Sequence, residues 1–519
     1  MPTLDWIGKD KVINHHMDVP YRVLEPQYTF GEDSGNKIIH GDNLEALKSL
    51  LPEYEGKIRC IYIDPPYNTG NEGWVYNDNV NDPRIRKWLG QVVGSESEDL
   101  SRHDKWLCMM YPRLKLLHRL LAEDGVIFIS IDDREQVNLR YICNEIFAEN
   151  NFLCQFVWQK RTSPDMRTQV STAHEYVCAY CKDIRRSDDS INKVALSEED
   201  AKNYKNPDND PRGPWVSTDF TAQGWRPNQM YTITTPSGKV LSPPEGRCWR
   251  HVEELCKQLY AENRLWFGAD GSGVPRKKVY LSESEGITPW TWLSNKDVGH
   301  TQEATKEIGQ VFGSPATFDY PKPVRLIQRI IQIATDKDSI ILDSFAGSGT
   351  TAHAVLNMNK QDSGNRKFIL IEMCDYAETI TAERVRRVIN GYGEGKKAVD
   401  GTGGGFTFYE LGEKLLDGEY LNENVPLDKI RSYVYFTETK QPVTDKADEP
   451  HYLGIYLDTA YYFYYDKNAA TTLNNTFLAT IKTKAESYVI YADRCILSDE
   501  ELERYHITFK KIPRDITRL

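Results

Sequence analysis

Residues 340–356 constrain the fold of this chain more than any other segment. An apolar run, Ile340–Asp343, leads through Gly347 and Gly349 into a stretch with helical spacing that starts near Thr350. A buried strand that turns over glycines into a helix is the unit from which parallel α/β sheets are built. Glycine lets a ligand approach the backbone closely, and the free N–H groups of the helix start favour an anionic group. The segment therefore predicts an α/β fold with a ligand site at this turn.

Other apolar runs predict the rest of the sheet. Short strands are expected near residues 38, 60, 128 and 369, and stretches with helical spacing separate them. This alternation predicts a doubly wound, mostly parallel sheet with helices on both faces. A break in the chain order would place the last two strands beside the earlier ones. With 519 residues, 40% of them hydrophobic, the chain is long enough for about three domains.

A second motif directly follows the apolar run Ile58–Ile63 and consists of Asp64, Pro65, Pro66 and Tyr67. It would lie at the carboxyl end of a strand, where open α/β sheets bind their ligands. Prolines have no N–H to donate, so the carbonyls around them accept hydrogen bonds beside a carboxylate that also accepts. The tyrosine adds a π face for a planar base. The motif therefore suits the amine of a planar base, and the structural alternative is a strand followed by a proline turn.

Two further acidic residues are expected at strand ends. Asp42 follows a short strand, where it either caps the next helix or accepts a hydrogen bond from a ligand. Glu372 ends the strand after the glycine turn, at about the position where such folds bind ribose hydroxyls. By itself the turn fits a nicotinamide, a flavin or S-adenosylmethionine equally well. Its pairing with the amine-binding motif discriminates between them.

The two motifs together resemble those of the DNA amino-methyltransferases, which modify exocyclic amines of DNA bases. Residues 64–67 resemble the catalytic motif, and residues 345–350 resemble the FxGxGT cofactor motif. Their order in the chain is that of the β group, and aspartate at position 64 is the form usually found in adenine-N6 enzymes.

Three longer strings narrow the resemblance to the Mod subunits of type III restriction-modification systems. They are DPPYNTGN (64–71), ISIDD (129–133) and YPKPV (320–324). The resemblance covers roughly residues 35–395 and implies a Rossmann-like methyltransferase sheet with a circularly permuted motif order. It also implies S-adenosylmethionine as the cofactor and requires no metal.

The resemblance assigns roles to individual residues. Catalysis would rest on Asp64, Pro65, Pro66 and Tyr67. The segment around Lys322 would close over the methionine end of the cofactor, unless this lysine is only a solvated cation. The predicted cofactor-binding residues are Asp42, Asp64, Lys322, Asp343, Phe345, Gly347, Ser348, Gly349, Thr350, Thr351 and Glu372.

Residues 151–310 are predicted to form a target-recognition domain between residues 1–150 and 311–400, the two halves of the methyltransferase domain. The stretch 151–300 is rich in Trp, Gly, Pro and Asn, and it holds 20 Lys or Arg against 19 Asp or Glu in a chain of net charge −12. The candidate contacts to DNA phosphates and base edges are Arg226, Arg247, Arg250, Arg276, Lys277 and Lys278. The alternative is a small aromatic core surrounded by solvated cations.

The last segment, 406–519, is expected to form a small α+β domain behind a glycine-rich linker, 391–405. Its runs at 453–457 and 461–465 predict strands. The resemblance to Mod subunits implies that this part supports a homodimer or contact with a restriction subunit, which carries the helicase and nuclease.

The sequence argues against a secreted or membrane-spanning protein, a protein that coats DNA indiscriminately and a zinc protein. No signal peptide or membrane-spanning run is visible, so a cytoplasmic protein without a membrane partner is expected. The acidic total argues against indiscriminate coating of DNA but not against a local basic cleft. Ten cysteines are scattered, and the pair Cys178 and Cys181 lacks the second ligand pair that a zinc site needs.

The predicted activity is direct transfer of a methyl group from S-adenosylmethionine to the N6 amine of an adenine flipped out of double-stranded DNA. Tyr67 would stack on the base, while Asp64 and the carbonyl of Pro65 or Pro66 would accept hydrogen bonds from the amine. A cytosine-N4 methyltransferase and a non-catalytic DNA-binding specificity protein remain as alternatives. A glutamine methyltransferase acting on protein fits less well, because it typically has Asn at the first motif position and needs no recognition domain.

Overall fold

The computed structural model describes residues 3–68, 87, 90, 102–186, 190–196, 201–418, 420–441, 443–444, 446, 448–513 and 515–516. Residues 69–71 of the DPPYNTGN string lie outside the described residues. The chain divides into two compact units, one of Met1–Asn192 with Trp290–Leu519 and one of Lys193–Pro289.

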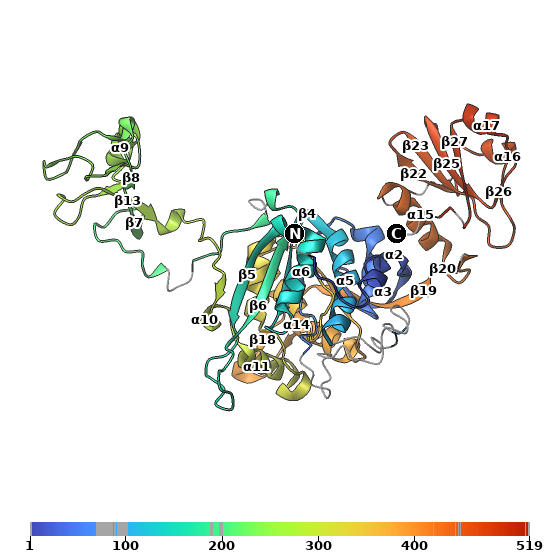
Figure 1. Cartoon of the computed structure of the whole chain (residues 1–519), viewed down its shortest axis with the longest axis horizontal. Helices are drawn as coiled ribbons and strands as arrows, with labels where there is room; N and C mark the ends of the chain where they lie inside the picture. The colour runs from blue at the N-terminus through green and yellow to red at the C-terminus, as the bar shows by residue number, and fades with distance from the viewer. Residues whose placement is uncertain are drawn as a thin grey trace. The chain divides into compact units, whose positions relative to one another are not determined.

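A ten-stranded sheet forms the centre of the first unit (Figure 1). Its order is β1 (Arg22–Gly31), β19 (Gly405–Lys414), β2 (Lys37–His40), β16 (Lys367–Glu372), β15 (Ile340–Asp343), β3 (Ile58–Ile63), β4 (Leu121–Ile131), β6 (His174–Cys181), β5 (Phe152–Gln159) and β14 (Trp292–Leu293). The six strands from β19 to β4 are parallel, whereas β1 and β6 join them in antiparallel pairs. All five strands predicted from the sequence are present, and they are neighbours in this sheet.

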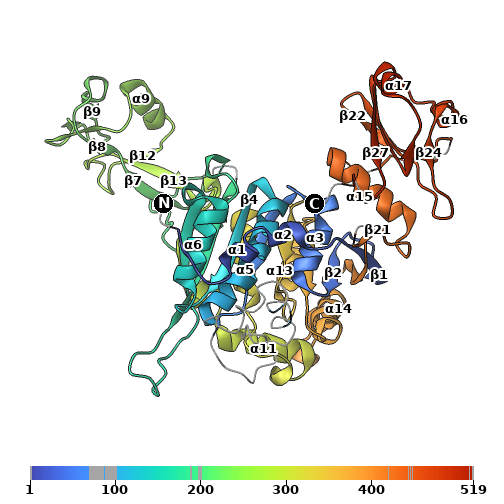
Figure 2. The same ribbon diagram turned by 45° about the vertical axis from the view of Figure 1, so that its right-hand side comes forward.

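Helices cover the sheet in two groups (Figure 2). One group contains α3 (Asn43–Tyr54), α5 (Arg102–Leu120) and α6 (Gln136–Phe147), in which α5 packs on both others. The other contains α11 (Thr301–Phe312), α12 (Val324–Ala334), α13 (Thr350–Asp362) and α14 (Glu383–Asn390). Helix α12 buries Leu326, Ile327, Ile330, Ile331 and Ile333, and this apolar stripe explains why the segment folds as a helix on the sheet.

Strands β3 and β15 lie side by side, with Ile341 opposite Cys60 and Leu342 opposite Ile61. The chain leaves β15 toward β16 through α13 and leaves β3 toward β4 through α5. The strand order therefore diverges between these two strands, and such a point opens a crevice at the carboxyl ends of a parallel sheet. Both motifs identified in the sequence end at this crevice.

The second unit has a core of its own. Strands β12 (Leu265–Trp266), β13 (Arg276–Tyr280) and β7 (Trp215–Asp219) form one sheet, and β8 (Thr221–Gln223) pairs with β11 (Arg247–Trp249) and β9 (Ile233–Thr234) with β10 (Val240–Leu241). Helix α9 (Glu253–Ala261) packs its buried side chains with Phe220, Trp249 and Phe267. This unit is narrower than the range 151–310, because β5, β6 and β14 of that range belong to the large sheet.

The C-terminal part contains a four-stranded sheet in the order β22 (Tyr452–Tyr456), β23 (Thr459–Phe463), β25 (Ser487–Ala492) and β27 (Ile507–Lys511). Both strands expected from the tyrosine-rich runs are present. The accompanying helices are α15 (Leu427–Thr439), α16 (Asn475–Leu478) and α17 (Asp499–Arg504). The large sheet reaches Lys414 through β19, so it extends past the expected boundary at residue 406.

The other short α-helices and β-strands whose bounds the structure describes lie in the first unit. They are α1 (Lys9–Val12), α2 (His15–Asp18), α10 (Asn295–Val298) and the pairs β17 (Gly391–Tyr392) with β18 (Val399–Asp400), β20 (Leu416–Asp417) with β21 (Tyr420–Leu421) and β24 (Thr472–Leu473) with β26 (Arg494–Cys495). None of the helices within the described ranges combines the length and apolarity needed to cross a membrane.

Candidate active site

Two buried carboxylates build the glycine turn after β15. Asp343 accepts the backbone N–H of Phe345 at 3.0 Å and the hydroxyl of Thr351, while Glu372 accepts the N–H of Gly347 at 2.8 Å. Burial raises the pKa of Asp343 to about 7 and also raises the pKa of Glu372. Both predicted cofactor residues therefore shape the turn itself.

The turn requires glycine at both predicted positions. Gly347 and Gly349 have φ values of 52° and 78°, which side chains rarely adopt. A Cβ at Gly349 would also lie 3.1 Å from the carbonyl oxygen of Thr381. Below the turn, the buried Arg384 donates to the hydroxyls of Ser348 and Thr350 at 2.8 Å each. These contacts hold the start of α13 in place.

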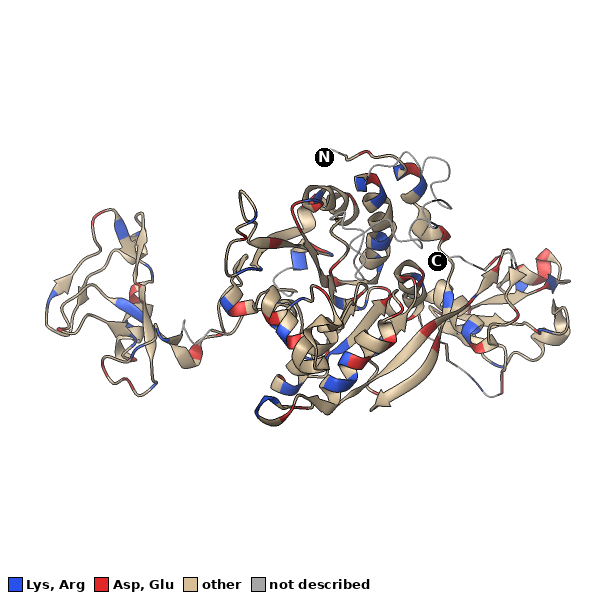
Figure 3. Cartoon of the chain, turned by 90° about the horizontal axis from the view of Figure 1, so that it is seen from below, with Lys and Arg blue, Asp and Glu red and all other residues tan. Residues whose placement is uncertain are grey.

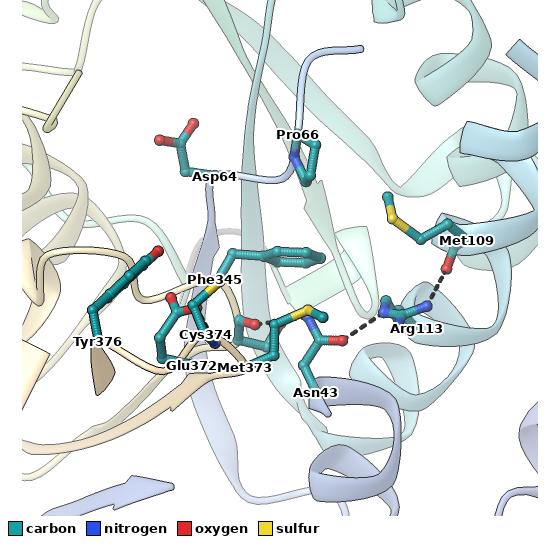
Figure 4. A pocket seen from close by; sticks show the side chains of 11 residues that line it. Asn43, Asp64, Pro66, Met109, Arg113, Phe345, Glu372, Met373, Cys374 and Tyr376 are labelled. Atoms are coloured by element: carbon teal, nitrogen blue, oxygen red, sulfur yellow. Dashed lines mark hydrogen bonds between the residues drawn. The ribbon is translucent and has the colours of Figure 1, made fainter. Parts of the chain in front are cut away.

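A pocket adjoins the turn (Figure 4). Its lining comes from the ends of β3, β15 and β16 and from α3 and α5, and consists of Asn43, Asp64, Pro66, Met109, Arg113, Ser344, Phe345, Glu372, Met373, Cys374 and Tyr376. Aromatic and apolar side chains form much of the wall, with a carboxylate at the end of β16. A planar heterocycle with a hydroxylated sugar matches this combination of surfaces.

Asp42 is the N-cap of α3, as the structural alternative predicted. Its Oδ1 accepts the backbone N–H of Leu44 at 2.8 Å, and its Oδ2 lies 3.7 Å from Nη2 of the buried Arg113. The same arginine donates to Asn43 at 2.6 Å, and Asn43 donates to the Ser344 carbonyl. Asn43 and Arg113 thus tie α3 and α5 to the glycine turn. Sequence reasoning missed both, although a charged side chain on the apolar face of α5 was a usable signal.

The catalytic motif emerges from β3 with its groups close together. The Tyr67 hydroxyl donates to Asp64 Oδ1 at 2.8 Å. The Pro66 carbonyl accepts the indole N–H of Trp106 at 2.6 Å. Within the described part of the chain, no hydrogen bond engages the Pro65 carbonyl. Of the two carbonyls considered from the sequence, the one at Pro66 is therefore already engaged within the chain.

Lys322 forms a cluster with Asp64 and Tyr67. Its Nζ donates to both carboxylate oxygens of Asp64, at 2.7 and 2.6 Å, and lies 5.0 Å from the centroid of the Tyr67 ring. Nζ is also 3.8 Å from Glu175 Oε2. The alternative of a solvated cation is wrong, since the Lys322 side chain is only 10% exposed.

Glu175 on β6 and Lys160 after β5 complete the cluster. Lys160 donates to Glu175 Oε1 at 2.8 Å, and the Tyr67 hydroxyl lies 3.2 Å from Oε2. Burial raises the pKa of Asp64 above its ordinary value despite the adjacent ammonium of Lys322. Burial acts in the same direction on Glu175, but the ammoniums of Lys322 and Lys160 outweigh it and lower the pKa. The composition of residues 151–300 had assigned Lys160 and Glu175 to the recognition domain, so their place near Asp64 was not predicted from the sequence.

The predicted DNA-binding residues differ widely in exposure. Arg226, Arg250 and Arg276 are exposed, and Arg226 follows Trp225, whose side chain is 69% exposed. Arg247 pairs with Asp219 at 2.8 Å and is partly buried, as is Lys277. Lysines and arginines are interspersed with acidic residues over the ribbon (Figure 3).

Lys278 does not fit the role predicted for it. Its side chain is fully buried and its ammonium donates to Asp208 and, at 3.0 Å, to Asp210. A cation enclosed by two carboxylates cannot reach a phosphate. The basic run therefore offers two candidate cations for DNA, Arg276 and Lys277, and one that stabilises the second unit.

Comparison with known proteins confirms the resemblance. A family model described as DNA methylase, N6_N4_Mtase, matches residues 58–383. The chain belongs to this family. It is 37% identical over 386 residues to the StyLTI Mod subunit of a type III restriction-modification enzyme from Salmonella typhimurium, covering 71% of this chain and 57% of that protein.

A second relative is the EcoPI Mod subunit of a type III restriction-modification enzyme from Escherichia phage P1. It is 33% identical, with coverage of 71% of this chain and 63% of that protein. The chain thus spans about three fifths of the length of these curated relatives. Among solved structures, the cytosine-N4-specific PvuII DNA methyltransferase matches 70% of this chain and 89% of its own, with 15% identity and a TM-score of 0.36.

Proposed function

We propose that this chain is a DNA methyltransferase that transfers a methyl group from S-adenosylmethionine to the N6 amine of a flipped-out adenine. One observation carries the proposal: an amine-accepting carboxylate, Asp64, ends the strand next to the one that carries the glycine turn. A substrate amine and a cofactor bound at these two strand ends would meet in one crevice. Membership in the DNA methylase family supports the same chemistry.

The residues of the crevice fit S-adenosylmethionine. Glu372 offers carboxylate oxygens for ribose hydroxyls, Phe345 and Tyr376 offer apolar walls for the adenine ring, and the start of α13 behind Gly347 favours the methionine carboxylate. When bound, this cofactor supplies a methyl group on a sulfonium leaving group. The chain then has to contribute only positioning and electrostatics.

The target amine would be held by two acceptors. Asp64 accepts one amine hydrogen, and the Pro65 carbonyl accepts the other, because the Pro66 carbonyl is already engaged by Trp106. Both hydrogens then point toward the protein, so the nitrogen lone pair turns away from these acceptors toward the cofactor side. The nitrogen becomes acidic when it gains the methyl group, and the proton that it loses passes to Asp64. The Tyr67 ring supports the base, whose extrusion from the duplex costs a few kcal/mol.

The remaining assignments follow the layout of the chain. Residues 1–150 and 311–400 would form the two halves of a circularly permuted methyltransferase domain. The compact unit Lys193–Pro289 between them is the candidate target-recognition domain. Arg226, Arg247, Arg250, Arg276 and Lys277 remain its candidate DNA contacts. The names of the relatives support a place as the modification subunit of a type III system, with the C-terminal part contacting a second copy or a restriction subunit.

Sequencing of a host genome with detection of modified bases tests the proposal. A host expressing the chain should carry N6-methyladenine at a defined site, and a host expressing Asp64→Ala should not. N4-methylcytosine would instead assign the chain to the cytosine-N4 enzymes, whose target presents a similar amine. Absence of any modification, together with failure to bind S-adenosylmethionine in calorimetry, would indicate a non-catalytic specificity protein.

A further inference from the structure

We propose that Glu175 is a positioning residue for the methyl transfer, because it receives the ammonium of Lys322 when the target amine takes its place at Asp64. The inference rests on the proposed function and adds to it an exchange of ion pairs. In this exchange Lys322 is a placeholder, a side chain that occupies the amine site until the base enters.

The ammonium of Lys322 occupies both surfaces that the target base needs. It donates to both oxygens of Asp64, at 2.7 and 2.6 Å, where the amine would donate. It also lies 5.0 Å from the centroid of the Tyr67 ring, on which the base would stack. A stacked base sits at van der Waals distance from the ring, nearer than the 5.0 Å at which the ammonium lies over it, so the base would run into the ammonium. The amine and the ammonium therefore cannot hold the site at the same time.

A second carboxylate lies within reach of the displaced ammonium. The Lys322 side chain is 10% exposed, and weakening an ion pair at such a site is costly unless another carboxylate offsets the loss. Glu175 Oε2 is 3.8 Å from Lys322 Nζ, so a shift of about 1 Å brings the pair to the usual distance of a charged hydrogen bond. The exchange needs only a small movement of the lysine head and no movement of the backbone.

The contacts of Glu175 allow it to receive the ammonium of Lys322. Lys160 holds Oε1 at 2.8 Å, which fixes the carboxylate and leaves Oε2 directed at Lys322 and Tyr67. The Tyr67 hydroxyl lies between the two carboxylates, 2.8 Å from Asp64 Oδ1 and 3.2 Å from Glu175 Oε2. The ammoniums of Lys160 and Lys322 face the carboxylates of Asp64 and Glu175 before and after the exchange. The charge of the cluster therefore stays balanced when Asp64 binds the substrate amine.

A double-mutant cycle between Glu175 and Lys322 tests the exchange. Glu175→Gln keeps the size and one acceptor oxygen for Tyr67 but removes the charge that would receive the lysine. Single-turnover methylation would be measured at saturating cofactor and varied DNA, on the site found in the host genome. Fluorescence of 2-aminopurine at the base next to the target adenine would report base extrusion, so that the target keeps its N6 amine. We expect Glu175→Gln to lower base extrusion and the rate at limiting DNA about tenfold, the size of a typical coupling between groups in contact.

The decisive comparison is the same substitution in a chain that has no placeholder. In the Lys322→Met background, Glu175→Gln should cost less than about threefold, since no ammonium then needs a new partner. Lys160→Met provides the matched control, because Lys160 also pairs with Glu175, at 2.8 Å, whereas the ammonium on Asp64 belongs to Lys322. The cost of Glu175→Gln should stay near tenfold in that background. Glu175→Asp keeps the charge and should recover part of the loss, and it replaces the glutamine variant if that one does not fold.

Equal losses from Glu175→Gln with and without Lys322 would overturn the exchange and leave Glu175 a structural residue. The same relief in the Lys160→Met background would also overturn it, because the effect would then belong to the general charge of the cluster. A wild-type chain that methylates no DNA would refute the proposed function itself, whereas additive losses in an active wild type refute the exchange alone.

Discussion

Removal of the buried Lys278 ammonium should destabilise the second unit, Lys193–Pro289, and leave the stability of the candidate active site unchanged. Lys278 is fully buried, and it donates to Asp208 and Asp210 from the middle of the central strand of a three-stranded sheet. Substitution by methionine keeps the length and apolar stem but leaves two carboxylates without their cation. Breaking a buried ion pair from one side typically costs about 3–5 kcal/mol.

The loss of stability in Lys278→Met should lie at the low end of that range. Asp210 keeps Arg212 at 2.8 Å and the Tyr280 hydroxyl at 2.8 Å, and the Asp208 side chain is 18% exposed, so water can partly replace the lysine there. We therefore expect the free energy of opening of this unit to fall by about 3 kcal/mol. At about 1.4 kcal/mol per factor of ten, this corresponds to a roughly hundredfold increase in the open population.

Hydrogen exchange followed by mass spectrometry measures this on the full chain. Amides of β7 and β13 should exchange roughly a hundredfold faster in Lys278→Met, while amides of β3 and β15 keep their protection. Arg276→Met is the matched control on the same strand, and because Arg276 is exposed its effect should stay within about 0.5 kcal/mol. Unchanged protection of β13 in Lys278→Met, or an equal loss in Arg276→Met, would refute the role assigned to this lysine.

Four further outcomes are expected. Asp64→Ala should abolish methylation while calorimetry still detects S-adenosylmethionine, and a loss of cofactor affinity as large as that of a turn variant would contradict the assignment. Gly347→Val should prevent cofactor binding, since the φ of 52° is strained for a β-branched residue; normal affinity would mean that the turn is not the cofactor site. Replacing Arg276 and Lys277 by alanine should reduce the slope of log K against log salt for DNA binding by about 0.9 for each lost phosphate contact, and an unchanged slope would show that these cations are only solvated. Asp64 has to be ionised to accept the amine, and the ammonium of Lys322 lowers the pKa of Asp64. Lys322→Met should therefore move the acid limb of the pH–rate profile to higher pH. An acid limb at the same or a lower pH would show that another group titrates.

Local chain chemistry made much of the fold predictable. The strand, glycine turn and helix of residues 340–356 follow from an apolar run, from backbone angles that favour glycine and from helical spacing, all of which act between near neighbours. Asp64 and the two prolines could be placed at a strand end for the same reason. Asp42 was ambiguous, because one carboxylate can cap a helix and bind a ligand, and the structure shows the cap.

Contacts between distant segments could not be read in this way. The break in chain order predicted that the last two strands lie beside the earlier ones, but not that β15 pairs with β3 itself. The approach of Lys322 and Glu175 to Asp64 and the engagement of the Pro66 carbonyl by Trp106 depend on how strands and helices far apart in the chain pack. Burial is equally non-local. Arg276 and Lys278 are neighbours of the same charge on one strand, yet one faces solvent and the other is enclosed by two carboxylates from a separate loop. The residue types in a sequence limit the chemistry available, whereas the partners that each charge meets are set by packing, since the cost of desolvating a charge depends on everything that surrounds it.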